Sequence, residues 1–476
     1  MATNATPDNI LETAAQLRAQ IGGEQYHDKL MESIYTDAAH IADQSVSREG
    51  QRARLGFDQL LDRALTHRVW GFVVMGLMLL GVFWLTIAGA NVPSAILSDF
   101  LLGTVYTWLH GLATALSFPT WLSGLLIDGI YLATAWVVSV MLPPMAIFFP
   151  LFTLLEDFGY LPRVAFNLDR LFHKAGAHGK QSLSMMMGFG CNAAGVIATR
   201  IIDSPRERLI AIITNNFSIC NGRWPTLILM GTIFIGATAP PAVASFFAAA
   251  SVVTIAVLGI FVTLIVSAFL SRTWLKGEAS VYSLELPPYR PPRIMQTLYT
   301  SVIDRTLIVL WRAVTMAAPA GAVIWLSSNV YIGDASIAAH LVNFLNPLGV
   351  LLGLNGVILV AYIVAIPANE IVIPTILMLT LTLGKNIAGA QAGVMVQLDD
   401  SQVYTVLTQV GGWTLLTAVN LMLFSLLHNP CSTTILTIWK ETKNLRWTVV
   451  ATVLPIVLGV AVTFTTATIA RLLGLV

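Results

Sequence analysis

The chain alternates between long apolar runs and short charged segments, a pattern that predicts a helical membrane protein. A helix of about 20 apolar residues crosses the roughly 30 Å of hydrocarbon in a bilayer. We expect spans of this kind at 69–90, 128–155, 209–235, 242–270, 313–330, 404–427 and 448–473. The sparsely charged stretch 91–127 is expected to lie at the outer side, outside any span.

Two further apolar runs carry interruptions. Residues 182–199 hold no charge, yet glycines, a thiol and a carboxamide stand at 188–192. Basic residues flank this run on both sides, which favours an element that enters and returns to the cytoplasmic face. Residues 351–383 are interrupted at 366–370 and are expected to enter from outside. A broken backbone in hydrocarbon needs protein or water to satisfy its polar groups, so both runs are predicted to line a path.

The two interruptions form an internal repeat. In the first half, Cys191-Asn192 is followed by a span that contains Cys220. In the second, Asn369-Glu370 is followed by a span that ends at Asn429 and Cys431. Opposite entry sides make this an inverted repeat, the architecture in which broken helices meet at a binding site near the bilayer midplane. Chance resemblance between low-diversity membrane segments is the alternative.

The predicted fold is therefore all-α and polytopic, with two halves built around broken or re-entrant helices. Helical spacing of apolar residues before the first span predicts short helices at 10–21, 30–41 and 57–65. No signal-peptide pattern is present, and the basic loops place the N-terminus in the cytoplasm. The expected organisation is a soluble helical leader or docking segment (1–68), a first membrane half (69–271), a cytoplasmic linker (272–312) and a second membrane half (313–476).

Composition supports this reading and excludes others. The chain has 476 residues, of which 56% are hydrophobic and 11% charged, whereas soluble domains carry about 25% charged residues. A net charge of +1 argues against a nucleic-acid partner. Three cysteines, all in or beside apolar segments, fit free thiols or metal ligands better than a disulfide framework.

The polar groups at the interruptions suit a divalent metal ion. Glu370 would cost about 2.5–3.5 kcal/mol at mid-membrane, so an acid there usually serves a pathway. Sulfur and oxygen donors together fit Fe(II), and fit Mn(II) or Zn(II) nearly as well. His428 could add a ligand but is more typical of an interfacial residue, and the methionines at 185–187 are more typical of packing. The candidate metal-site residues are Cys191, Asn192, Cys220, Asn369, Glu370, Asn429 and Cys431.

Several motifs resemble the membrane domain of the bacterial ferrous-iron transporter B (FeoB) family. They are the segments 156–166 (EDFGYLPRVAF), 188–192 (GFGCN), 284–290 (LELPPYR), 429–431 (NPC) and 61–68 (LDRALTHR). The resemblance implies two Gate-type halves and import of Fe(II) across the bacterial inner membrane. It also implies that Cys191, Cys220 and Cys431 lie on the ion path.

The sequence departs from that family in places. Ala193-Ala194 replaces the usual Val-Pro after the first motif, and Asn369 replaces a lysine beside Glu370. No phosphate-binding Gly-x-x-x-x-Gly-Lys-Ser/Thr loop and no guanine-reading motif is present. The expectation is a transporter rather than an enzyme, with Fe(II) as substrate, no resident cofactor, and GTP acting only through a separate GTPase subunit. A small FeoA-like protein is a further expected partner besides membrane lipid, and homo-oligomer formation stays open.

Two other functions are also compatible with the sequence. Gate-type halves also resemble nucleoside-recognition modules, for which the cysteines would be incidental. A receptor or scaffold that kept the fold but lost transport would bind no metal. Competition by nucleosides and a metal titration separate these functions from a metal permease.

Overall fold

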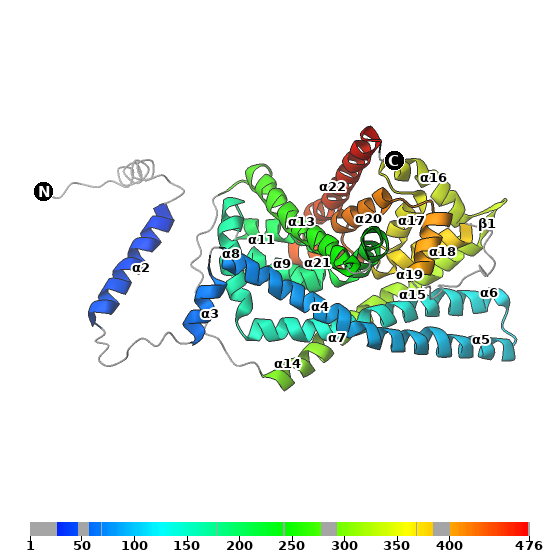
Figure 1. Cartoon of the computed structure of the whole chain (residues 1–476), viewed down its shortest axis with the longest axis horizontal. Coiled ribbons are helices and arrows are strands. Elements are labelled where there is room, and N and C mark those ends of the chain that lie inside the picture. Colours follow the sequence, from blue (N-terminus) through cyan, green and yellow to red (C-terminus); the bar gives the residue numbers. More distant parts are fainter. Residues whose placement is uncertain are drawn as a thin grey trace.

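The protein is almost entirely helical in a computed structural model that describes residues 26–45, 57–67, 69–177, 179–240, 243–277, 293–367, 369–383 and 400–474. Helix α2 (Tyr26–Ser45) is drawn apart from the helical body in Figure 1. Helix α3 (Phe57–Leu65) packs against the start of α4. These two helices confirm the spacing at 30–41 and 57–65, while 10–21 lies outside the described residues.

A long helical hairpin opens the membrane part and projects to the right in Figure 1. The expectation that 91–127 lies outside any span is wrong, because the helix that begins at Trp70 continues to Ala115, and its part from Val92 on is itself apolar enough to cross a membrane. Tyr106 Oη donates to Asp128 Oδ1 (2.6 Å), which joins the two arms. The arms are α4 (Trp70–Ser98), the π-helix η1 (Asp99–Val105) and α5 (Tyr106–Ala115), then α6 (Thr120–Ser123), the π-helix η2 (Gly124–Tyr131) and α7 (Leu132–Asp157).

The first interrupted region follows the hairpin. The break predicted within 182–199 is confirmed, since one helix ends at Gly190 and the next begins at Asn192. The predicted span 209–235 is interrupted as well, which the sequence reading did not foresee. The elements are α8 (Tyr160–Lys174), α9 (Gln181–Gly190), α10 (Asn192–Ala198), η3 (Thr199–Ile201), α11 (Pro205–Thr214), η4 (Asn215–Phe217), η5 (Asn221–Arg223), α12 (Trp224–Met230), η6 (Gly231–Ile235), η7 (Gly236–Thr238) and the long α13 (Ala244–Arg272).

The second half repeats this use of broken helices. The break at 366–370 is confirmed, with α17 ending at Val364 and helical turns resuming at Asn369. A bend of 112° also separates α16 from α17. The elements are α14 (Ile294–Thr300), η8 (Ser301–Leu307), α15 (Ile308–Asn329), the short strands β1 (Tyr331–Ile332) and β2 (Ala335–Ser336), α16 (Ile337–Leu351), α17 (Gly356–Val364), η9 (Asn369–Ile371), α18 (Val372–Leu383), α19 (Asp400–Thr405), η10 (Val406–Val410), α20 (Leu415–Leu427), α21 (Ser432–Thr442) and α22 (Leu445–Leu472).

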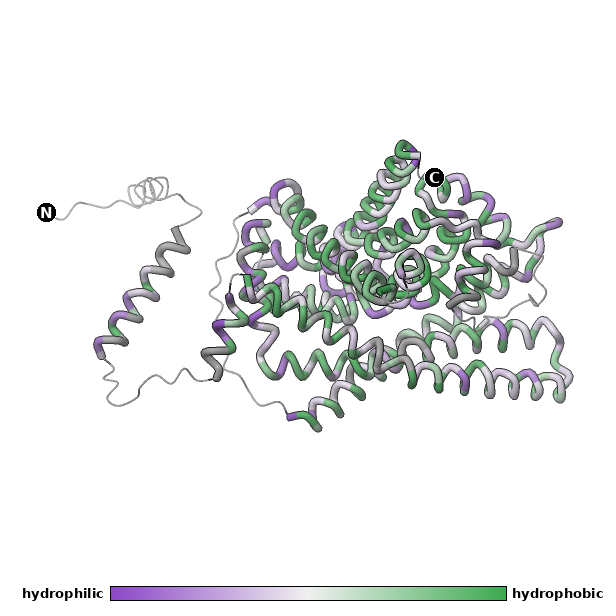
Figure 2. Tube along the Cα trace, viewed as in Figure 1, coloured by the Kyte–Doolittle hydropathy of each residue, from purple (hydrophilic) through white to green (hydrophobic). Residues whose placement is uncertain are grey.

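The described helices define a polytopic membrane protein. Five of them are long and apolar enough to cross a membrane, or six if the bent pair is one span. Figure 2 shows hydrophobic residues along the whole length of α13 and α22. On α13, Phe261 and Ile265 are 57% and 66% exposed, as side chains facing lipid would be. The inverted relation of the halves and the domain boundaries stay predictions.

Candidate functional site

All three cysteines stand where a helix is broken. Cys191 has an extended backbone (φ −152°, ψ 123°) between α9 and α10. Cys431 (φ −64°, ψ 159°) directly precedes α21, and Cys220 (φ −74°, ψ 164°) precedes η5. In three separate segments, a cysteine therefore has an extended backbone directly before a helical element.

These breaks meet at one cavity of about 130 Å³. Six of the seven candidate metal-site residues line it: Cys191, Asn192, Cys220, Asn369, Glu370 and Cys431. The seventh, Asn429, is not in the lining, and its Nδ2 donates to the Pro430 oxygen (3.1 Å). The sequence reading missed two hydroxyl-bearing residues in the wall, Thr433 and Thr434. Their position directly after the Asn-Pro-Cys break was the available signal.

The Glu370 carboxylate lies directly against a glycine of the other half, Gly222. A Cβ on Gly222 would lie 2.4 Å from Glu370 Oε1 and 2.6 Å from its Cδ. Both residues line the cavity, Gly222 from η5 and Glu370 from η9. The absence of a side chain at 222 thus lets the acid of the second half lie directly against the first.

The amide of Asn369 links the cavity to a buried histidine. Its Nδ2 lies 3.9 Å from Cys220 Sγ, and its Oδ1 lies 3.2 Å from His428 Nε2. The expectation of an interfacial His428 is wrong, since the side chain is 2% exposed and its Nδ1 also lies 2.9 Å from the Ser425 oxygen. Asn369 therefore contacts both a thiol and an imidazole.

The other carboxamides hold the first break in shape. Asn215 Nδ2 donates to the Asn192 oxygen (2.8 Å). Asn192 Nδ2 lies 3.3 Å from Asn216 Oδ1, and with its amide reversed it donates instead to the oxygens of Gly188 (3.0 Å) and Ser218 (3.1 Å). The Asn192 side chain is buried, and its amide nitrogen has a hydrogen-bond acceptor within the protein in either orientation.

Close approach explains two glycines beside the break. A Cβ on Gly188 would lie 2.7 Å from Asn215 Oδ1, and one on Gly195 would lie 2.4 Å from the same atom. The Gly195 Cβ would also lie 2.8 Å from the Ser184 backbone oxygen. These glycines therefore serve packing as well as the interruption of the helix.

A buried arginine lies beside the cavity. Arg223 is 1% exposed, and its guanidinium bonds to both halves of the protein. One charge within an otherwise uncharged apolar stretch is the sequence signal that marked it.

An ion-pair cluster joins two helices that lead away from the cavity. Helices α10 and α21 pack together, and each begins directly after a cavity cysteine. Beyond the far end of α10, Arg200 lies 2.6 Å from the carboxylate of Glu441 on α21, and Arg208 also lies 2.6 Å from it. Hydrogen bonding to Glu441 raises the pKa of Arg200 above its ordinary value. The ion pairs thus connect α21 to the chain that follows α10, at the ends of the two helices away from the cavity.

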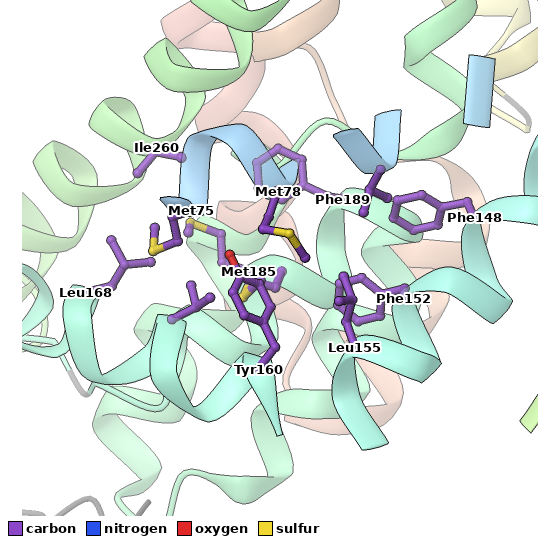
Figure 3. A pocket seen from close by; sticks show the side chains of 13 residues that line it. Met75, Met78, Phe148, Phe152, Leu155, Tyr160, Leu168, Met185, Phe189 and Ile260 are labelled. Atoms are coloured by element: carbon purple, nitrogen blue, oxygen red, sulfur yellow. The ribbon is translucent and has the colours of Figure 1, made fainter. Parts of the chain in front are cut away.

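A second cavity, of about 70 Å³, is apolar and is lined by side chains of α4, α7, α8, α9 and α13 (Figure 3). Its wall includes Met185, Met186 and Phe148, and the sticks in Figure 3 carry no charged group. A Cβ on Gly190 would lie 2.9 Å from the Phe148 ring, so Phe148 packs directly against a residue that lines the polar cavity. The two methionines face this apolar space rather than the cysteines.

Among the described residues, no three His, Cys, Asp or Glu side chains are grouped closely enough to form a ready-made metal cage. The donors converge on a shared cavity without a closed coordination shell.

Fold and site together define a polytopic helical membrane protein with two Gate-type segments. The family model described as nucleoside recognition (Gate) matches residues 138–234 and 310–445, and the model described as ferrous iron transport protein B C terminus matches residues 252–304. The chain belongs to the FeoB family.

Curated relatives agree with this membership. A protein named Fe(2+) transporter FeoB from Staphylococcus aureus (strain MSSA476) is 30% identical over 410 residues, 86% of this chain and 58% of the relative. That of strain COL is 28% identical over 459 residues, 96% of this chain and 64% of the relative. The Synechocystis protein of the same name is 30% identical over 402 residues, covering 84% and 61%. The chain thus spans about three fifths of these relatives, and no solved structure matches it.

Proposed function

We propose that this protein is a permease that moves Fe(II) inward across the bacterial inner membrane. The observation that carries the proposal is the convergence of Cys191, Cys220, Cys431 and Glu370 on one cavity between the two halves. A mixed set of thiol, carboxylate and carboxamide donors can replace the water around a divalent ion of borderline softness. The names of the relatives support Fe(II) over other metals.

The membrane potential is a sufficient driving force. Moving two charges inward releases about 4.6 kcal/mol per 100 mV, twice the value for a single charge. This corresponds to more than a thousandfold concentration ratio at equilibrium, since each 1.4 kcal/mol is about tenfold. A separate GTPase subunit and a FeoA-like protein would then act as regulators of opening.

Uptake by purified protein in liposomes tests the proposal. Under an imposed inside-negative potential, vesicles with the protein should accumulate Fe(II) kept reduced, and vesicles without it should not. Parallel assays with Mn(II) and Zn(II) rank the metals. Absence of Fe(II) uptake with the potential applied, both alone and with an added GTPase subunit, would refute the permease.

A nucleoside substrate is the second candidate, because the matching family model carries that description. Nucleobases are usually held by stacking on aromatic side chains. No aromatic ring is among the described residues that line the polar cavity, which favours a small ion. Inhibition of Fe(II) uptake by nucleosides, or nucleoside uptake itself, would reverse that preference. A protein that binds no metal in titration would instead be a receptor or scaffold.

A further inference from the structure

The guanidinium of Arg223 connects the broken helices of the two halves. Its Nη1 donates to the backbone oxygens of Asn216 (2.9 Å) and Leu426 (3.0 Å). Its Nη2 donates to Asn216 Oδ1 (3.1 Å) and to the backbone oxygens of His428 (3.3 Å) and Asn429 (3.2 Å). Two of these acceptors belong to the first half and three to the end of α20 in the second.

The second-half acceptors are groups that a helix end leaves without partners. The last four carbonyl groups of an α-helix have no intrahelical donor. Here α20 ends at Leu427 and the chain turns through Pro430, which has no N–H to offer. A planar guanidinium with five donors can span several such oxygens at once, whereas a lysine ammonium has three donors at a single point.

The bonded atoms lie very close in sequence to two cavity thiols. Arg223 follows Cys220 by three residues, and the His428 and Asn429 carbonyls precede Cys431 by three and two. Asn216 strengthens the same link, because its Nδ2 donates to the His428 oxygen (2.9 Å). These bonds therefore connect the two chain segments that carry Cys220 and Cys431.

We propose that Arg223 is a positioning residue that holds Cys220 and Cys431 at one cavity by joining the two helix breaks. Its effect on transport rests on the proposed permease function, but its effect on geometry does not. Without the hydrogen bonds of the Arg223 guanidinium the two thiols move apart, so a metal ion would no longer contact both. The guanidinium itself does not bind the ion.

Co(II) provides a direct readout of this geometry. Thiolate ligands give bound Co(II) a charge-transfer absorption whose intensity rises with the number of thiolates. The full chain in detergent is titrated with Co(II) as wild type, Arg223→Lys and Cys431→Ser. We expect Arg223→Lys to lose absorption down to the level of Cys431→Ser although all three cysteines remain, and to take up Fe(II) at least tenfold more slowly in liposomes.

Arg163→Lys is the matched control. Arg163 is also buried, at 2% exposed, but its Nη1 donates to the Gly159 oxygen (2.8 Å) and its Nε to Asp62 Oδ1 (3.0 Å), two residues that do not line the cavity. This variant should keep the wild-type cobalt absorption, which separates a specific role of Arg223 from the general cost of replacing a buried arginine. An equal loss in both variants would overturn the proposal.

Asn216→Ala is the milder perturbation if Arg223→Lys fails to fold. It removes one acceptor of the Arg223 guanidinium and the bond from Asn216 to the His428 oxygen. It should therefore also lower the cobalt absorption, but by a smaller amount than Arg223→Lys. Wild-type absorption in a folded Arg223→Lys, or in Asn216→Ala where the former does not fold, would overturn the proposal. If the wild type shows thiolate absorption but no Fe(II) uptake, the permease fails while the positioning role is still decided by the spectra.

Discussion

The contact between Gly222 and Glu370 allows a one-methyl test of the acid's role. In the change Gly222→Ala, the new Cβ would start 2.4 Å from Glu370 Oε1, whereas ordinary van der Waals contact begins at 3.4 Å. The carboxylate must therefore move by about 1 Å, the difference between these two distances. The crowded atoms are at the free end of a flexible side chain, so they can swing away at little cost to folding.

The expected functional loss is much larger than the loss of stability. Displacements of about 1 Å at a reacting site can cost on the order of 100-fold, and changes around metal ligands typically cost about 10- to 100-fold in affinity or activity. We therefore expect Gly222→Ala to lower Fe(II) uptake about 10- to 100-fold while the thermal unfolding of the protein in detergent changes little.

A double-mutant cycle shows whether the effect passes through Glu370. Uptake is measured in liposomes for Gly222→Ala, Glu370→Ala and the double variant. Residues in contact are expected to be non-additive, so the double variant should match Glu370→Ala alone. Gly81→Ala is the control, because a Cβ on that helical glycine meets nothing within 4 Å. Full uptake by Gly222→Ala, or losses that simply multiply, would refute this account of the site.

Five other substitutions test the remaining features. Cys191→Ser and Cys431→Ser should each lower Fe(II) uptake by at least the roughly tenfold typical of weakened metal sites, and unchanged uptake would remove that thiol from the path. Glu441→Gln should lower the midpoint of thermal unfolding most at low salt, because it leaves two arginines without their shared carboxylate; a midpoint unaffected at every ionic strength would contradict this. Asn420→Leu should cost about 1–3 kcal/mol in unfolding free energy, because it removes the donor to the Leu352 backbone oxygen (2.8 Å) and the acceptor of the Thr466 hydroxyl (2.6 Å); an unchanged unfolding curve would contradict this. Gly195→Ala should cost about 1–3 kcal/mol through overpacking, and a stability equal to wild type would show that the helix pair can yield.

Local signals in the sequence located two of the interruptions correctly and missed the one within 209–235. The breaks at Cys191 and near Asn369 follow from glycine, proline and carboxamide groups inside otherwise apolar runs, because such groups disfavour a continuous helix in hydrocarbon. The same reading failed at 91–127, where sparse charge suggested an outer segment and the structure continues the helix. Polar residues within this helical hairpin, such as Tyr106 and Asp128, bond to each other across its two arms. The polar composition of such a segment therefore does not show where a helix ends.

The amino-acid sequence by itself determined the class of protein, the breaks at Cys191 and near Asn369, and most of the polar residues at those breaks, since these depend on hydropathy and residue type along the chain. Only the tertiary structure decided that six of the seven candidate metal-site residues share one cavity, that Asn429 lies outside its lining, and that His428 is buried. It also decided the hydrogen-bond partners of Arg223, two of which, Leu426 and His428, are more than 200 residues away in the chain. Contacts of this kind arise from packing between the halves, which no local pattern of residues encodes.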